Sequence, residues 1–294
     1  MVDELTTNLL SVLLFGSVQG AVFALLALGF SLVYGVGGVL NLAHGGFYLA
    51  CMYTFYWCIK IWEISLPITI IITLIVIILI TILTFLLLIK PLQDSAVGVL
   101  LATFSLAFFF EQLVKVLPWS DSQTHWVPSI VEQPIEVFGI NFPFRYVVTI
   151  IGSIILVVSL YFFIKKSRIG KSIRAVAQDR EAAQLMGINA NMVIMLTLVI
   201  SGFLAAMATF LYGAGEEVTP AMGWGFLTTS FAIVVLGGLG SIPGSILGAF
   251  LIGYARTFCS YFISTQFAEI FPIIIIIVML LFRPQGLLGK KEVE

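Results

Sequence analysis

Charged side chains are scarce in this chain, and positive ones are absent from its beginning. Only 10% of the 294 residues are charged, whereas 60% are hydrophobic, a balance that excludes a water-soluble domain of this length. No Lys or Arg precedes Lys60, and Asp3 and Glu4 stand where a secretory signal needs positive charge. We therefore expect the first apolar stretch to be a retained span of a polytopic membrane protein, not a cleaved signal peptide.

Cysteine and histidine are also rare, which limits the chemistry that the chain can perform. The three cysteines, Cys51, Cys58 and Cys259, all lie in apolar segments and are expected to be small core residues. His44 and His125 are the only histidines and are far apart in the sequence, so we predict no metal site. Because no paired carboxylates and no nucleophile with a base are apparent, we expect no catalytic residues, no cofactor and no enzymatic activity.

Long uncharged runs define the fold class. Residues 64–89 contain no charge, and at about 1.5 Å per residue such a helix exceeds the roughly 30 Å hydrocarbon layer. The sequence therefore predicts an all-α, polytopic helical transmembrane bundle of about 8–9 spans. The expected spans are 9–33, 40–59, 65–89, 97–117, 144–164, 191–213, 219–236, 245–262 and 265–282.

The uncharged stretch 218–255 leaves an alternative open. It is too long for one crossing, and the turn signal "GGLGSIPG" at 237–244 divides it. Two crossings there give nine spans in all. The alternative is a re-entrant hairpin near 219–244.

The distribution of charge predicts the orientation. Residues 164–190 carry an excess of Lys and Arg over acidic residues, whereas 118–143 holds acidic residues and no Lys or Arg. Because short cytoplasmic loops are enriched in Lys and Arg, the loop 164–190 is expected inside. Arg283, Lys290 and Lys291 place the C-terminus inside as well, and an odd number of spans then puts the N-terminus outside.

The loop 164–190 contains the signature of a short helix. Asp179 is a suitable N-cap, the string "REAAQLM" is rich in helix formers, and Gly187 is a suitable terminator. We expect Ala182, Ala183, Leu185 and Met186 to form an exposed apolar surface. Such a surface on a rigid helix is typical of a docking site.

Four blocks of the sequence carry a family resemblance. The string "EAAQLMG" fits the E-A-A-x-x-x-G pattern by which ABC importer permeases contact their ATPase subunits. Together with "GAVFALLALGFSLVYGVGGVLNLAHGGFYLACMY", "VVLGGLGSIPGSILGAFLIG" and "LLFRPQGLLGK", it resembles the LivH-type permeases of branched-chain amino acid importers. Two positions depart from that pattern: Gly46, where a larger residue is common, and Arg256, where Glu is frequent.

This resemblance implies the role and the partners of the chain. It implies a single transmembrane permease domain over residues 1–294, with 164–190 as its cytoplasmic coupling loop, in a bacterial or archaeal cytoplasmic membrane. The implied partners are two ATP-binding subunits, a second related permease, an extracytoplasmic solute-binding protein and the lipid bilayer, with no nucleic acid. The implied ATPase-coupling residues are Asp179, Glu181, Ala182, Ala183 and Gly187.

The solute and the energy source are less constrained. The resemblance implies ATP-driven import of Leu, Ile or Val, but related permeases carry urea or short amides. The string "GKS" at 170–172 lacks the earlier glycine of a phosphate-binding loop, since Lys165 stands there, so ATP hydrolysis is expected in separate chains. An ATP-independent secondary carrier is the remaining alternative, and it should show acidic residues at mid-span. Glu111 and Glu269 come closest, and both lie near span ends.

Several further polar residues and glycines have candidate roles. Asn41 and His44 either cap a helix and hydrogen-bond within the bundle or line the solute path. The residues near the late turn either pack tightly or move as a gate beside the coupling helix: Gly237, Gly240, Pro243 and Gly244.

Arg256 is expected to reach the outer surface or to pair with Glu269. Glu111 and Lys115 are expected to form a local ion pair, being four residues apart.

Overall fold

The computed structural model describes residues 2–117, 124–127, 133–137, 139–283 and 285–289. Its α-helices are α1 (Val2–Gly37), α2 (His44–Tyr56), α3 (Leu66–Thr84), α4 (Lys90–Leu92), α5 (Ala96–Val116), α6 (Phe144–Lys166), α7 (Arg168–Gln178), α8 (Arg180–Leu185), α9 (Ala190–Ala208), α10 (Met222–Gly237), α11 (Ile242–Phe262) and α12 (Thr265–Phe282). Three π-helical segments, η1 (Trp57–Ile61), η2 (Phe85–Ile89) and η3 (Thr209–Gly213), extend α2, α3 and α9. The short strands are β1 (His125–Trp126), β2 (Pro134–Val137), β3 (Ile140–Pro143) and β4 (Glu217–Val218).

The fold class expected from the sequence is confirmed. Among the described residues, seven helices are long and apolar enough to cross a membrane, and α10 is a shorter apolar helix. With α2, which η1 extends, these helices account for the spans expected from the sequence. The outward faces of α3, α6 and α12 expose rows of Ile, Leu and Phe side chains. Only a lipid environment or a membrane partner can cover such a surface.

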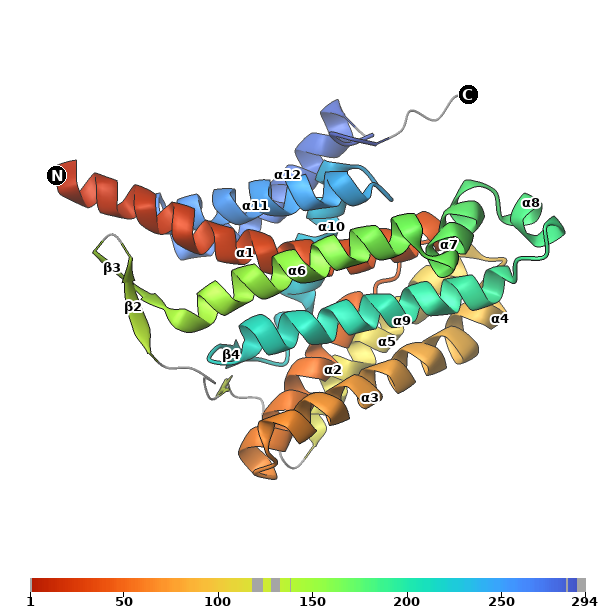
Figure 1. Cartoon of the computed structure of the whole chain (residues 1–294), viewed down its shortest axis with the longest axis horizontal. Coiled ribbons are helices and arrows are strands. Elements are labelled where there is room, and N and C mark those ends of the chain that lie inside the picture. The colour runs from red at the N-terminus through yellow and green to blue at the C-terminus, as the bar shows by residue number, and fades with distance from the viewer. Residues whose placement is uncertain (1, 118–123, 128–132, 138, 284, 290–294) are drawn as a thin grey trace.

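The bundle has two distinct ends (Figure 1). The N-terminus of α1 and the β2–β3 hairpin lie at one end, and α7 and α8 lie at the other. The hairpin pairs Pro134 with Pro143, while β1 pairs with β4 of the segment before α10. The described part of the segment 118–143 and the loop 164–190, which differ in charge, therefore lie at opposite ends of the bundle.

Helix α1 packs along α11 through small residues. A Cβ atom at Gly253 would lie 2.5 Å from the backbone nitrogen of Gly20, and one at Gly20 would lie 2.6 Å from the ring of Phe250. The Ser17 hydroxyl hydrogen-bonds to that of Tyr254 at 2.8 Å. Small residues allow this close approach, which supplies the dispersion contacts that hold helices together in lipid.

The chain after residue 218 forms three separate helices. Helix α10 begins beside α5, where Trp224 contacts Glu111, and it ends at a turn where Gly240 lies 3.3 Å from a Cβ built at Gly35 in the last turn of α1. Gly238 and Gly240 have φ values of 105° and 77°, which a glycine adopts readily. The turn thus lies at the same end as α7, and residues 219–244 form one helix and the start of the next instead of a re-entrant hairpin.

Helix α7 was not expected from the sequence. The Ser167 hydroxyl accepts a hydrogen bond from the Gly170 backbone nitrogen at 2.8 Å and caps it. Ile173 and Val176 are buried, while Lys171 is exposed, so α7 is amphipathic and lies against the bundle. Its N-cap serine and its apolar spacing were present in the sequence as signals.

Candidate coupling surface and solute path

Helix α8 is short, capped at both ends and exposed at its tip. The Asp179 carboxylate accepts a hydrogen bond from the Ala182 backbone nitrogen at 2.9 Å, and Gly187 ends the helix with a φ of 84°, as expected from the sequence. Leu185 and Met186 are 88% and 82% exposed. This pair forms an apolar tip that projects from the end of the bundle.

One residue of the expected docking surface is placed differently. Ala183 is only 5% exposed, because it faces the bundle, so the expectation that it forms part of the exposed apolar surface is wrong. Glu181 and Ala182 are exposed. The small size of Ala183 therefore serves to seat α8 on the bundle, while Leu185 and Met186 form the apolar tip.

Arg180 ties α8 to the α4–α5 connection and to helix α9. One of its terminal nitrogens, Nη2, donates to Gln93 Oε1 at 2.8 Å and to Asn191 Oδ1 at 3.2 Å. Gln93 lies between α4 and α5, and Asn191 lies in the first turn of α9. Because Arg180 and Gln93 are far apart in the sequence, no local pattern could have predicted this contact.

The Arg180 contact borders an internal cavity. The cavity has a volume of about 30 Å³ and is lined by Arg180, Gln93 and Asn41 together with apolar side chains. It connects the base of α8 with the segment before α2. A cavity of this size has room for water.

Helix α2 begins inside the bundle, preceded by non-helical residues 38–43. His44 Nδ1 hydrogen-bonds to Ser201 in the middle of α9 at 3.0 Å, and the Leu42 backbone nitrogen donates to Thr103 Oγ1 in α5 at 3.2 Å. Irregular backbone at membrane depth occurs where it is covered by protein or lines a cavity, and transporters place such breaks at solute sites.

Asn41 and His44 lie in this buried segment, at 4% and 2% exposure. Asn41 Oδ1 accepts a hydrogen bond from the Ala43 backbone nitrogen at 3.1 Å, although the N-cap position of α2 is Ala43 and no side chain caps it. The amide nitrogen of Asn41 is buried with no hydrogen-bond partner and borders the cavity beside Arg180. Both residues therefore form hydrogen bonds within the bundle, and Asn41 also lines the cavity beside Arg180.

Helices α2 and α10 meet through glycines. A Cβ atom at Gly45 would lie 2.3 Å from the Gly223 carbonyl oxygen, so the two backbones are in contact. Beside them, Glu111 Oε1 pairs with Lys115 at 2.6 Å, as expected, and its Oε2 accepts from Trp224 Nε1 at 2.6 Å. The carboxylate thus also fastens α5 to α10, a contact that the sequence did not predict.

The glycines of the late turn are in tight packing contacts. A Cβ atom at Gly237 would meet the Gly244 carbonyl oxygen at 2.2 Å, and one at Gly244 would meet that of Gly237 at 2.1 Å. Pro243 lies in the first turn of α11, where its missing N–H costs nothing, and Gly240 provides the turn. These contacts agree with the packing role, and a gate role of the four residues stays a prediction.

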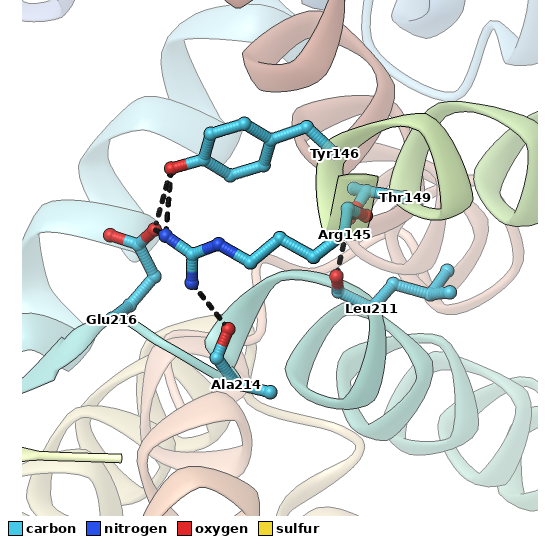
Figure 2. Close-up of polar contacts among 6 residues, drawn as sticks. All are labelled: Arg145, Tyr146, Thr149, Leu211, Ala214 and Glu216. Carbon is cyan, nitrogen blue, oxygen red and sulfur yellow. Dashed lines mark hydrogen bonds and ion pairs between the residues drawn. The ribbon is translucent and has the colours of Figure 1, made fainter. Parts of the chain in front are cut away.

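A polar cluster closes the opposite end of the bundle (Figure 2). Arg145 donates to Glu216 Oε1 at 3.0 Å and to the Ala214 carbonyl oxygen at 2.5 Å, and the Tyr146 hydroxyl donates to the same Glu216 oxygen at 3.0 Å. Thr149 Oγ1 donates to the Leu211 carbonyl oxygen. The cluster therefore fastens the start of α6 to η3 and to the loop that follows it.

Burial raises the pKa of the Glu216 carboxyl above its usual value, although Arg145 acts in the opposite direction. The loop containing Glu216 lies outside the helices that can cross the membrane. A carboxylate in this position is costly to desolvate and depends on Arg145 to remain charged.

Arg256 has neither of its expected arrangements. Its Nη1 donates to Thr229 Oγ1 at 3.4 Å, and the guanidinium carbon lies 5.4 Å from the centre of the Phe23 ring. Glu269 is exposed, and no ion pair joins these two described residues. The pairing with Glu269 is therefore wrong, and Arg256 points into the bundle instead of reaching the outer surface.

The architecture defines a class of protein. A polytopic helical bundle with a helix that begins at mid-depth, and with a capped, exposed helix at one end, has features typical of integral membrane transport proteins. The chain belongs to the family described as branched-chain amino acid transport system / permease component, whose model matches residues 12–282. It is thus a multi-pass permease subunit, as the sequence resemblance indicated.

Individual relatives agree with this assignment. The high-affinity branched-chain amino acid transport system permease protein BraD of Pseudomonas aeruginosa is 30% identical over 95% of both chains. The permease protein LivM of Escherichia coli (strain K12) is 26% identical over 91% of this chain and 68% of its own. Among solved structures, PsaBC from Streptococcus pneumoniae in complex with Fab shares the fold, with a TM-score of 0.52 and 12% identity over 97% of both chains.

Proposed function

We propose that the chain is a permease subunit of an ATP-driven, binding-protein-dependent importer of Leu, Ile or Val in a cytoplasmic membrane. Its partners would be a second related permease, two ATP-binding subunits and an extracytoplasmic binding protein. The similarity to BraD and LivM, both named as branched-chain amino acid permeases, supports the solute class. Escherichia coli (strain K12) has both LivH and LivM, and the similarity of this chain to both supports a paired permease. The excess of Lys and Arg in 164–190 supports placing α8 and the C-terminus in the cytoplasm, with the N-terminus outside.

The apolar tip of α8 carries this proposal. Two large apolar side chains, Leu185 and Met186, project almost fully exposed from a helix that is capped at both ends. Exposed apolar surface on a fixed helix stabilises the protein only if another surface covers it. On the cytoplasmic side of a permease, a groove in an ATP-binding subunit would fit this tip.

The contacts of Arg180 suggest how movement passes from the tip into the bundle. Closure of the ATP-binding subunits would displace α8 as a rigid body. Arg180 would then shift the α4–α5 connection through Gln93 and the start of α9 through Asn191. Both segments border the buried residues before α2, so the displacement would reach the proposed solute path.

The secondary-carrier alternative lacks support among the described residues. A proton-coupled carrier uses titratable side chains, most often carboxylates, at mid-span. Glu111 is engaged by Lys115 and Trp224, and Glu269 is exposed in the first turns of α12. Neither acidic residue borders the cavity beside Asn41.

Co-purification of the complex tests the proposal. Leu185→Asp should abolish co-isolation of the ATP-binding subunits and uptake of labelled L-leucine, while membrane insertion and the elution profile of the permease stay unchanged. Val116→Asp is the matched control, because Val116 is 81% exposed at the other end of the bundle. Normal assembly and uptake with Leu185→Asp would contradict the docking assignment, and uptake of urea instead of L-leucine by the intact complex would contradict the solute class.

A further inference from the structure

A second cavity lies on the side of the bundle away from α8. It has a volume of about 80 Å³ and is lined by Gln19, Val22, Phe23, Tyr212, Phe226 and Arg256. These residues come from α1, η3, α10 and α11. The space exceeds the roughly 10–15 Å³ that a single water molecule requires.

Arg256 is a membrane-depth charge with few direct contacts, and the charge of Glu269 acts on it only from a distance. A guanidinium has five N–H donors, but the described residues give it one long hydrogen bond to Thr229 and a ring contact with Phe23. No described carboxylate lies within 4.0 Å of it. A charge in the interior of a membrane bundle is costly unless it is paired or faces water, so such a residue normally serves a ligand or a transported solute.

The other walls of the cavity complement a small amphiphilic molecule. Gln19 Oε1 is buried without a hydrogen-bond partner, and Gln19 also lines the cavity. Val22, Phe23 and Phe226 supply apolar surface. The cavity therefore offers one cation, one free amide acceptor and several apolar groups, which fit a carboxylate, an ammonium group and an aliphatic side chain, respectively.

The position of the cavity agrees with entry from the end opposite α8. Arg256 lies fourteen residues from the start of α11 at Ile242, which is about 21 Å along the helix axis. Tyr212 in the cavity wall also stacks on Tyr146 of the polar cluster, with 6.3 Å between ring centres. Tyr212 thus joins the cavity to the Arg145–Glu216 cluster, at the end of the bundle that the proposed orientation places outside.

We propose that this cavity is a carboxylate-binding site on the solute path. Arg256 would hold the α-carboxylate of the entering amino acid by charge-assisted hydrogen bonds, and Phe23 and Phe226 would contact its aliphatic side chain. This inference rests on the proposed function and specifies its solute class. Urea and short amides have no carboxylate for Arg256, so the site selects against them.

Uptake by the complete importer in liposomes is the first test. Replacing Arg256 by Gln should lower the initial rate of L-leucine uptake about tenfold or more, the scale expected for one charge-assisted hydrogen bond. Arg256→Lys, which keeps the charge, should retain more of the rate. Glu269→Gln is the matched control, since it removes the acid once expected to pair with Arg256. Uptake at the original rate in Arg256→Gln, or an equal loss in Glu269→Gln, would overturn the proposal.

Labelling of a cysteine in the cavity is the second test and needs no transport. In the purified complex carrying Gln19→Cys, a negatively charged thiosulfonate should react faster than a positively charged one, and L-leucine should slow the reaction whereas L-leucinamide should not. Arg256→Gln should abolish both differences. Equal protection by L-leucine and L-leucinamide would overturn the carboxylate site. A complex that shows neither uptake nor stimulated ATP hydrolysis, but keeps this protection pattern, would instead overturn the proposed function alone.

Discussion

Replacing Arg180 should separate ATP hydrolysis from solute movement. Arg180→Met keeps the aliphatic stem but removes the hydrogen bonds to Gln93 and Asn191. A buried hydrogen bond to a charged group contributes about 1.5–3 kcal/mol. Because Arg180 is only partly buried, we assign roughly 0.7 kcal/mol to each bond, or about 1.4 kcal/mol together, which corresponds to about a tenfold change in an equilibrium.

The measurement is the number of L-leucine molecules taken up per ATP hydrolysed, in liposomes containing the complete importer. We expect this ratio to fall about tenfold in Arg180→Met, while ATP hydrolysis stimulated by the loaded binding protein remains, because the tip of α8 is unchanged. Arg168→Met is the matched control, since Arg168 is an exposed cation of the same loop. An unchanged ratio in Arg180→Met, or the same fall in Arg168→Met, would refute the role of Arg180 in transmission.

Three further predictions concern stability. At neutral pH, the Glu216→Gln protein should melt at the same temperature as the original protein or at a higher one. The reason is that the pKa of Glu216 is raised in the fold, so its charged carboxylate destabilises the folded state. The difference in melting temperature should vanish as the pH falls below the usual carboxyl pKa. Arg145→Gln should melt lower at neutral pH, with a loss that shrinks on acidification as Glu216 takes up a proton; a loss independent of pH would contradict the burial argument. Gly253→Val should reduce the yield of folded protein, because the valine side chain would collide with the backbone of α1. Gly225→Ala should not reduce the yield, because nothing lies within 4 Å of the added Cβ atom. Fluorescence-detected gel filtration measures both yields, and equal yields would contradict the packing account.

The sequence predicted the helical spans and the caps of α8 well, because both depend on local signals. Hydrophobic length defines a span, and Asp179 and Gly187 act on backbone atoms within a few residues of themselves. The π-helical ends of α2, α3 and α9 were not predicted, since they leave the apolar pattern unchanged.

Contacts between distant segments could not be derived in this way. The bonds of Arg180 to Gln93 and of Arg145 to Glu216 join segments whose proximity follows only from the packed bundle. The burial of Ala183 and the inward position of Arg256 have the same origin, because helical periodicity assigns residues to faces without identifying the neighbour. Asn41 and His44 are buried in the bundle, and their role in the solute path stays a prediction, but the interior start of α2 is visible only in three dimensions.

The pairing of α1 with α11 bears on how the protein is made. Helix α1 precedes α11 by more than two hundred residues in the sequence, yet α11 covers Gly20 and its Tyr254 hydroxyl hydrogen-bonds to Ser17. Until α11 is synthesised, the face of α1 that carries Gly20 and the Ser17 hydroxyl has no helix packed against it. The bundle can therefore be completed only late in translation. In a nascent chain that stops before α11, this face of α1 would stay uncovered, and we expect quality-control proteases to degrade such a chain.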